Sequence, residues 1–131
     1  MNYDRFIGVP YKAGARGPDA YDCYGLVAAI YKAAKGIDLP DWYASAPGVP
    51  AAARAISDAL AGETKAGRAV KVDDPQELDI AVVGGAQTAN HVGVVVNGGV
   101  IHSSKTFGST WHSMTRFKMF YPRTEFYRWQ P

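Results

Sequence analysis

The sequence contains one cysteine in 131 residues, and this scarcity is its most informative absence. A single cysteine cannot form an intrachain disulfide, and it cannot build a metal site that needs several thiolate ligands. Cys23 is therefore either a small buried hydrophobic residue or a reactive thiol. Composition by itself leaves both alternatives open.

The chain also lacks any apolar run of the roughly 20 residues that a transmembrane helix needs. Residues 1–7 contain neither the basic start nor the apolar stretch of a signal peptide. We therefore expect a soluble protein without membrane insertion that is made in the cytoplasm. If it acts outside the cell, another component has to carry it there.

An excess of one charge is absent too, because 14 Lys and Arg residues stand against 12 Asp and Glu residues. The closest basic gathering alternates with aromatic residues near the C-terminus and comprises Arg116, Lys118, Arg123 and Arg128. Strands with solvated outer faces explain this pattern better than a nucleic-acid groove does. We therefore predict no nucleic-acid partner, although an anionic polymer of another kind stays open.

What the chain does contain is typical of a globular protein. The hydrophobic fraction is 47% and the charged fraction is 20%, both close to the average for such proteins. A length of 131 residues matches one hydrophobic core. Since no repeat, linker or shift in composition divides the chain, we predict a single domain over residues 1–131.

The hydrophobic pattern places helices before strands. Helical spacing and capping residues predict a short helix at 2–7 capped by Asn2, a helix at 23–35 between Asp22 and Gly36, and an Ala-rich helix at 51–61 that ends at Gly62. Extended segments are expected at 70–72, 79–83, 91–96, 100–103 and 124–129. The intervening stretches 8–18 and 37–50 are rich in Gly and Pro and are expected to be loops. This order predicts an α+β fold with antiparallel strands.

Cys23 is placed at the first position of the predicted helix 23–35. The positive end of the helix dipole favours a thiolate there. The backbone N–H groups of a first helical turn can also donate to an oxyanion. A nucleophile needs both features, so this position favours a reactive thiol over a merely buried one.

A thiol nucleophile also needs a base, which is usually histidine. A two-residue turn at Asn97-Gly98 would pair Val96 with Gly99 and Gly93 with His102. His91 then shares a face with His102 as its diagonal neighbour, about 7–8 Å away. We expect Gly93 to leave that face open, and a three-residue turn would break this parity. A base oriented by a second group follows the logic of a catalytic triad.

His112 has no such placement, and we expect it on a loop or on a strand surface. The plainer interpretation of His91 is a solvent-facing residue at the start of a strand, and that of His102 is a half-buried histidine with satisfied hydrogen bonds. Two histidines on one face, together with a cysteine at a helix start, favour the catalytic interpretation.

Several motifs, taken in order, resemble those of the NlpC/P60 cysteine peptidases. Residues 22–27 (Asp-Cys-Tyr-Gly-Leu-Val) resemble the Asp-Cys-x-Gly-Leu-Val signature of that family. The family also has a Pro-Tyr loop before its cysteine, and Tyr11 lies twelve residues before Cys23, as the tyrosine of that loop does. Residues 90–95 (Asn-His-Val-Gly-Val-Val) resemble the His-Val-Gly strand. Residues 100–103 (Val-Ile-His-Ser) resemble the next strand with its third polar residue.

The resemblance implies a papain-like α+β fold and hydrolysis of bacterial peptidoglycan by a Cys-His-His thiol mechanism. The implied target is the stem-peptide bond between the γ-carboxyl of D-glutamate and a diamino acid. Carried over by position, Cys23 is the nucleophile, His91 the general base and His102 the orienting group. Tyr11 would lie near the oxyanion or substrate, and Asp22 would help to bind the amine end of the stem peptide. No cofactor or metal is implied.

The chain departs from the family pattern at two positions. Tyr24 follows the cysteine where a serine is common, and this resembles the phage tail-associated branch. That branch implies a virion component at the tail tip, with other tail-tip proteins as partners. Leu78 replaces the usual glycine of a Pro-Gly-Asp turn, which puts that turn in question. Residues 38–70 match nothing that would indicate substrate specificity.

Three other functions compete with the endopeptidase. A structural tail protein could keep the fold for docking, and a peptidoglycan amidase could use the same thiol chemistry. A mononuclear metal hydrolase could use Cys23 with histidines, but the sequence lacks a helix-borne pair such as His-Glu-x-x-His.

Overall fold

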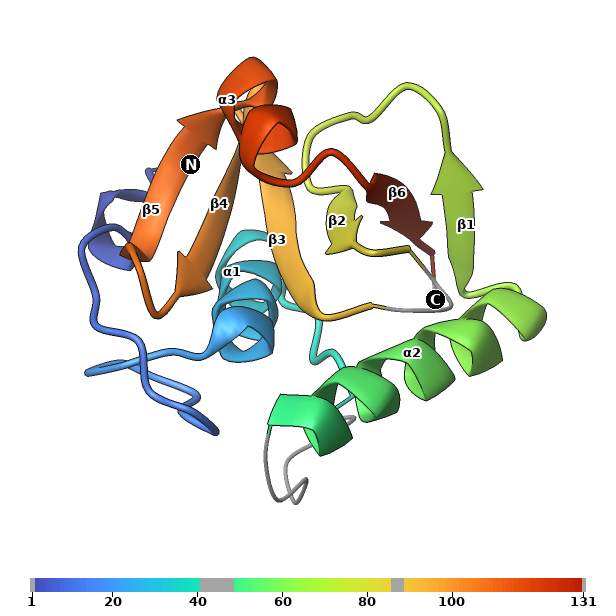
Figure 1. The fold of residues 1–131 in the computed structure, drawn as a ribbon, viewed down its shortest axis with the longest axis horizontal. Coiled ribbons are helices and arrows are strands. Elements are labelled where there is room, and N and C mark those ends of the chain that lie inside the picture. The colour runs from blue at the N-terminus through green and yellow to red at the C-terminus, as the bar shows by residue number, and fades with distance from the viewer. Residues whose placement is uncertain (1, 41–48, 86–88, 131) are drawn as a thin grey trace.

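The computed structural model describes residues 2–40, 49–85 and 89–130 and contains one six-stranded antiparallel sheet. The strand order is β1-β6-β2-β3-β4-β5, which places the β3–β4 hairpin well inside the sheet (Figure 1). The strands comprise β1 (Ala69–Val72), β2 (Ile80–Val83), β3 (His91–Val96), β4 (Gly99–Ser104), β5 (Gly108–Ser113) and β6 (Thr124–Trp129). The α+β prediction is therefore confirmed, and each of the five predicted strands is present to within one residue at each end.

Helix α1 (Cys23–Lys35) has the bounds that the sequence predicts. The Asp22 side chain accepts a hydrogen bond from the Gly25 N–H at its start, and Gly36 adopts a left-handed conformation at its end. The apolar face of α1, including Leu26, Val27 and Ile30, is fully buried. Helix α1 packs against β3 and β4, next to which it is drawn in Figure 1.

The other two predicted helices differ from their expected bounds. The opening segment forms only a 3₁₀ helix, η1 (Asp4–Phe6), although the Asn2 side chain does accept a hydrogen bond from the Asp4 N–H. Helix α2 (Val49–Lys65) is longer than expected at both ends and runs past Gly62. A single glycine costs a helix about 1 kcal/mol, which is too little to end it by itself.

Two elements were not predicted, β5 and helix α3 (Met114–Phe120). The strand β5 carries mostly polar residues and one buried serine, Ser109, so it lacks apolar alternation. Helix α3 buries one side chain, Phe117, which is too little to produce a helical period. Ser113 caps this helix by accepting a hydrogen bond from the Arg116 N–H. The helix packs on β4 and β5, opposite α1.

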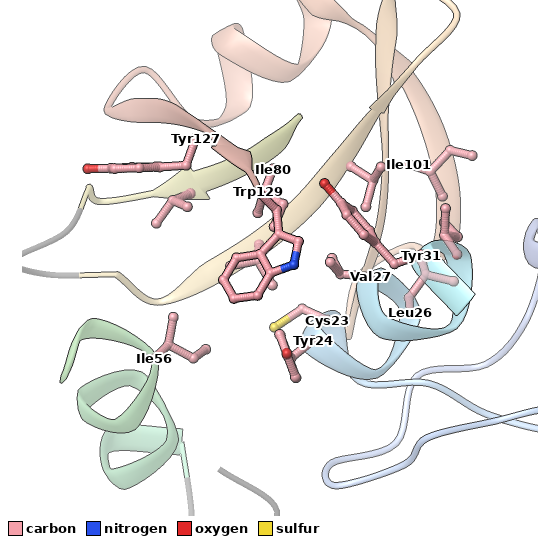
Figure 2. Packing of buried hydrophobic residues seen from close by; sticks show 14 of the residues in the cluster. Cys23, Tyr24, Leu26, Val27, Tyr31, Ile56, Ile80, Ile101, Tyr127 and Trp129 are labelled. Carbon is pink, nitrogen blue, oxygen red and sulfur yellow. The ribbon is translucent and has the colours of Figure 1, made fainter. Parts of the chain in front are cut away.

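The core is split by the sheet into two parts. Alternate residues of β3 face α1 (Val92, Val94 and Val96), whereas Val95 packs with Phe117 of α3 on the other side. Figure 2 shows the larger cluster around α1 and α2. Within the described part of the chain, no helix combines the length and apolarity needed to cross a membrane.

Candidate active site

The β3–β4 hairpin has the register that its turn sequence predicts. Val96 pairs with Gly99 and Gly93 pairs with His102, so the two-residue turn at Asn97-Gly98 is confirmed. Asn97 and Gly98 both have positive φ, as a type I′ turn requires. His91 and His102 therefore project from the same face of the sheet, which is the face covered by α3.

The imidazole rings of the two histidines meet across the hairpin. The Nε2 atom of His91 lies 2.9 Å from the Nδ1 atom of His102, which is hydrogen-bonding distance. The expectation that Gly93 leaves this face open is wrong, because a Cβ atom at that position would lie 2.6 Å from Val100 Cγ1 and 3.1 Å from His102 Cβ. Glycine is needed at position 93 because the neighbouring strand fills the space.

A third histidine extends the chain of imidazoles. The Nε2 atom of His102 lies 2.8 Å from the Nδ1 atom of His112, which comes from β5. His112 does lie on a strand, but the expectation that it belongs to the surface is wrong, because its half-buried ring faces the site. The residue pairs opposite Val100 and so stands diagonally to His102, one strand further out.

Burial governs the electrostatics of this cluster. It lowers the pKa of His91 to about 4, and together with the neighbouring His91 and His112 it lowers the pKa of His102 to about 3. The rings of Phe117 and Tyr121 meet His102 edge to face, with centroids 5.0 and 5.8 Å away. Both histidines are therefore neutral near pH 7, and His91 is able to accept a proton.

Tyr121, just after α3, lies against His91 and close enough to Cys23 to be affected by its charge. Its ring centroid lies 5.2 Å from that of His91. Burial and the negative charge of the Cys23 thiolate both raise the pKa of Tyr121. A tyrosine in contact with His91 thus senses the charge of Cys23, so the thiol and the histidines belong to one neighbourhood.

Tyr11 belongs to the same neighbourhood as Cys23 and Asp22. Burial, then the charges of Cys23 and Asp22, raise its pKa. A bridge between Tyr11 and Tyr21 holds the loop before α1 against the start of that helix. The structure therefore brings the other four predicted site residues into the neighbourhood of Cys23: Tyr11, Asp22, His91 and, through His91, His102.

Asp22 is buried and its carboxylate is already engaged. One oxygen accepts from the Gly25 N–H at 2.7 Å and the other from the Gly14 N–H at 3.1 Å. Both oxygens also lie within 2.9 Å of Nη1 of Arg16, which neutralises the charge. An amine that bound to Asp22 would have to displace Arg16 or share the carboxylate with it.

The glycine of the cysteine motif has a steric purpose. A Cβ atom on Gly25 would lie 2.3 Å from the Ala15 carbonyl oxygen and 2.9 Å from an Asp22 carboxylate oxygen. Only a glycine lets the loop before α1 lie so close to the first turn of the helix. Figure 2 shows Cys23 and Tyr24 at this end of α1.

Tyr24 is buried, and its hydroxyl donates to the Pro40 carbonyl oxygen. The large side chain at this position therefore belongs to the core rather than to solvent.

The turn at Leu78 forms despite the missing glycine, because Leu78 itself adopts a φ of 68°. The hydroxyl of Tyr31 donates to the Leu78 carbonyl oxygen and the Leu78 N–H donates to the Val95 carbonyl oxygen.

The C-terminal basic residues do not form one solvated strand face. Arg116 and Lys118 lie on α3, and Arg123 lies between that helix and β6. Arg128, on β6, makes two hydrogen bonds of 2.9 and 3.0 Å to the buried carboxylate of Asp79. This pair is a structural ion pair that ties β6 to the start of β2.

Within the described residues, no group of three or more His, Cys, Asp or Glu side chains is arranged to hold a metal ion. The ring nitrogens of the three histidines face one another in a line, as hydrogen-bond partners do. They do not converge on a common point as metal ligands would.

A sequence model of the NlpC/P60 family matches residues 8–125, which is most of the chain. The chain belongs to the NlpC/P60 family. The resemblance expected from the cysteine and histidine motifs is thereby confirmed.

Individual relatives agree with the NlpC/P60 assignment. The chain is 32% identical over 105 residues to a gamma-D-glutamyl-L-lysine dipeptidyl-peptidase of Bacillus subtilis (strain 168). The match spans 77% of this chain but only 29% of that relative. The chain therefore corresponds to less than a third of the length of the curated relative that it matches.

Solved NlpC/P60 structures share the fold. The NlpC/p60 domain of the peptidoglycan hydrolase SagA matches with a TM-score of 0.64 at 22% identity, over 97% of this chain and 92% of that one. NlpC1 from Trichomonas vaginalis matches with a TM-score of 0.62 at 23% identity, over 96% of this chain and 41% of that one. At these identities the likeness supports the fold alone.

Two residues of the candidate site were missed by sequence reasoning, His112 and Tyr121. Nothing marks Tyr121 in the sequence, because its position depends on the unpredicted helix α3. His112 could have been found by extending the hairpin argument. A third antiparallel strand at 108–113 pairs Thr110 with His102, which puts His112 on the same face.

Proposed function

We propose that this chain is a cysteine peptidase that hydrolyses peptidoglycan stem peptides. The observation that carries the proposal is the hydrogen bond between His91 and His102 in the neighbourhood of Cys23, which lies at the start of α1. This combination supplies a nucleophile, a base and a group that orients the base. In this assignment Cys23 is the nucleophile, His91 the general base and His102 the orienting group.

The reaction starts with transfer of the Cys23 thiol proton to Nδ1 of His91, since Nε2 of that ring is engaged with His102. The sulfur then attacks the carbonyl carbon of the scissile amide and forms a tetrahedral oxyanion. As this intermediate collapses, the bond from carbon to nitrogen breaks and His91 gives its proton to the leaving amine. Acyl-cysteine, a thioester, remains.

Water completes the cycle. His91 removes a proton from the water molecule and the hydroxide attacks the thioester carbonyl. The bond from carbon to sulfur then breaks, and His91 returns the proton to the Cys23 sulfur. The products are a carboxylic acid and the regenerated thiol. The Cys23 N–H at the positive end of α1 and the Tyr11 hydroxyl are proposed to stabilise the oxyanion in both halves of the reaction.

The proposed target is the bond between the γ-carboxyl of D-glutamate and a diamino acid. The relative from Bacillus subtilis supports it, because that protein is named for gamma-D-glutamyl-L-lysine peptides and shares 32% identity over 105 residues. Asp22 is proposed to receive the amine end of the stem peptide, in which case that ammonium competes with Arg16 for the carboxylate.

Replacement of the nucleophile tests the activity. The wild-type protein should release new muropeptides from purified peptidoglycan, and Cys23→Ala should lower this rate by several orders of magnitude because no other thiol is present. Mass spectrometry of products from defined stem peptides identifies the bond and separates an endopeptidase from an amidase. Equal absence of cleavage in both proteins would refute the proposal and favour a structural protein.

We further propose that the chain acts at a phage tail tip, where it would contact other tail proteins and open the cell wall. Tyr24 supports this, because an aromatic residue after the cysteine resembles the phage tail-associated branch. Mass spectrometry of purified virions should then detect the chain, and its absence from intact particles would refute the tail role without touching the peptidase.

A further inference from the structure

His112 takes no part in the proposed reaction steps, yet it forms a hydrogen bond with His102, the residue that orients the base. Its Nδ1 atom lies 2.8 Å from Nε2 of His102, and His102 is completely buried. Both ring nitrogens of His102 therefore face another imidazole, one from β3 and one from β5. A buried N–H or bare nitrogen without a partner would be costly, so His112 decides how His102 can carry its proton.

The number of protons on the three imidazoles determines which ring nitrogen donates and which accepts in each hydrogen bond. A neutral imidazole has one N–H donor and one bare acceptor nitrogen. When His91 holds the proton of Cys23 it carries N–H groups at both nitrogens, so its Nε2–H must donate to a bare Nδ1 of His102. The proton of His102 then lies on Nε2, and that N–H requires an acceptor, which is Nδ1 of His112.

Hydrogen bonds that run in the opposite direction, from His112 toward His91, would block the reaction. If His112 donated from Nδ1, His102 would carry its proton on Nδ1 and donate to Nε2 of His91. The proton of His91 would then lie on Nδ1, the nitrogen that has to receive the thiol proton. Only the direction that ends on a bare Nδ1 of His112 leaves His91 competent as a base.

We propose that His112 is a positioning residue that accepts the Nε2–H of His102 and thereby holds His102 and His91 in the tautomers that catalysis needs. The inference rests on the proposed roles of Cys23 and His91. It adds a third imidazole to the two that the sequence motifs indicate.

The surroundings of His112 favour the acceptor role. Its ring meets Phe107 edge to face and Phe120 at a tilt, with centroids 4.9 and 5.1 Å away. Burial and the positive charge of Arg116 on α3 lower the pKa of His112, so it is neutral near pH 7. The other titratable groups in the line are His102 and His91, with Tyr121 and Cys23 beyond them.

The matched variants His112→Asn and His112→Leu test the role, because Asn and Leu have similar shapes and differ in the acceptor. His112→Leu should lower kcat by about tenfold with little change in KM, since one net hydrogen bond corresponds to roughly that factor. His112→Asn, whose amide oxygen can take the place of Nδ1, should recover most of the rate. Equal kcat values for wild type, Asn and Leu would overturn the proposal.

A second readout does not depend on peptide cleavage. The rate of Cys23 alkylation by iodoacetamide against pH reports how readily the thiol gives up its proton to His91. His112→Leu should slow alkylation at neutral pH by about tenfold and shift the midpoint upward, whereas His112→Asn should match the wild type. If the native protein does not cleave peptidoglycan but this pattern holds, the proposed function fails and the role of His112 stands.

A third readout needs no variant and therefore survives a folding failure of His112→Leu. Nitrogen-15 NMR of the wild-type imidazoles should show His102 protonated at Nε2 and bare at Nδ1, and His112 bare at Nδ1. The opposite tautomer of His102 would overturn the proposal.

Discussion

Close contacts can decide the backbone conformation of a residue in this protein against the conformational preference of its residue type. Leu78 shows this best, because a φ of 68° costs a leucine about 1 kcal/mol relative to a glycine. Its side chain packs against the main core. Its backbone carbonyl oxygen accepts a hydrogen bond from the Tyr31 hydroxyl, and its N–H donates to the Val95 carbonyl oxygen. These contacts hold the residue in a conformation for which glycine is the natural choice.

Substitution of Leu78 by two small residues separates strain from packing. Leu78→Ala removes the side chain and keeps the unfavourable φ, whereas Leu78→Gly removes both. We expect the glycine variant to have a free energy of unfolding about 1 kcal/mol higher than the alanine variant, measured by urea denaturation. An alanine variant as stable as the glycine variant would show that no strain is present.

At the scale of elements, the site depends on how closely β3 and β4 approach each other. Gly93 on β3 leaves room for the Ile101 carbonyl oxygen and for the Cβ atom of His102. Phe117 of α3 and Tyr121, directly after it, then cover the histidines. The hairpin supplies the histidines, and α3 supplies the apolar surroundings that keep them neutral.

Gly93→Ala tests this close approach. The added methyl group would lie 3.0 Å from a backbone oxygen and 2.6 Å from Val100 Cγ1, so the hairpin has to shift. We expect a loss of about 1–3 kcal/mol in the free energy of unfolding, together with a loss of activity.

Gly62→Ala is the matched control for that variant. Gly62 lies inside α2, and nothing stands within 4 Å of the Cβ position. This change should raise stability by up to about 1 kcal/mol, because alanine has the higher helix propensity. If Gly93→Ala behaved like Gly62→Ala, the packing between β3 and β4 would be looser than the structure indicates.

At the scale of the whole molecule, the buried histidines make stability depend on pH. His91 and His102 have pKa values of about 4 and about 3 in the folded protein, against an ordinary value of 6.5. Between pH 6.5 and those values the unfolded chain binds more protons than the folded one. Stability is therefore full above pH 6.5 and falls as the pH decreases toward 3.

Urea denaturation at pH 7 and pH 4.5 measures this effect. We expect the free energy of unfolding of the wild type to fall by about 2 kcal/mol or more over this range. Acidic residues contribute as well, so the comparison is with His102→Asn, which should show a clearly smaller fall. An equal fall in both proteins would assign the effect to carboxylates instead.

Much of the fold follows from local signals in the sequence. The bounds of α1 are set by Asp22 and Gly36 at its ends, and the Asn97-Gly98 turn sets the register of β3 and β4. These signals act between residues close in sequence, so they can be recognised without the structure. They placed Cys23 at a helix start and put His91 and His102 on one face.

The sequence by itself thus determined the fold class, the family and the identity of the candidate nucleophile and its two histidines. Only the tertiary structure decided that Arg16 neutralises Asp22, that Tyr121 lies against His91 near Cys23, and that His112 extends the line of imidazoles. The last two depend on β5 and α3, which have weak local signals and are held by the sheet and core. Such contacts join segments far apart in the chain, and no local pattern encodes them.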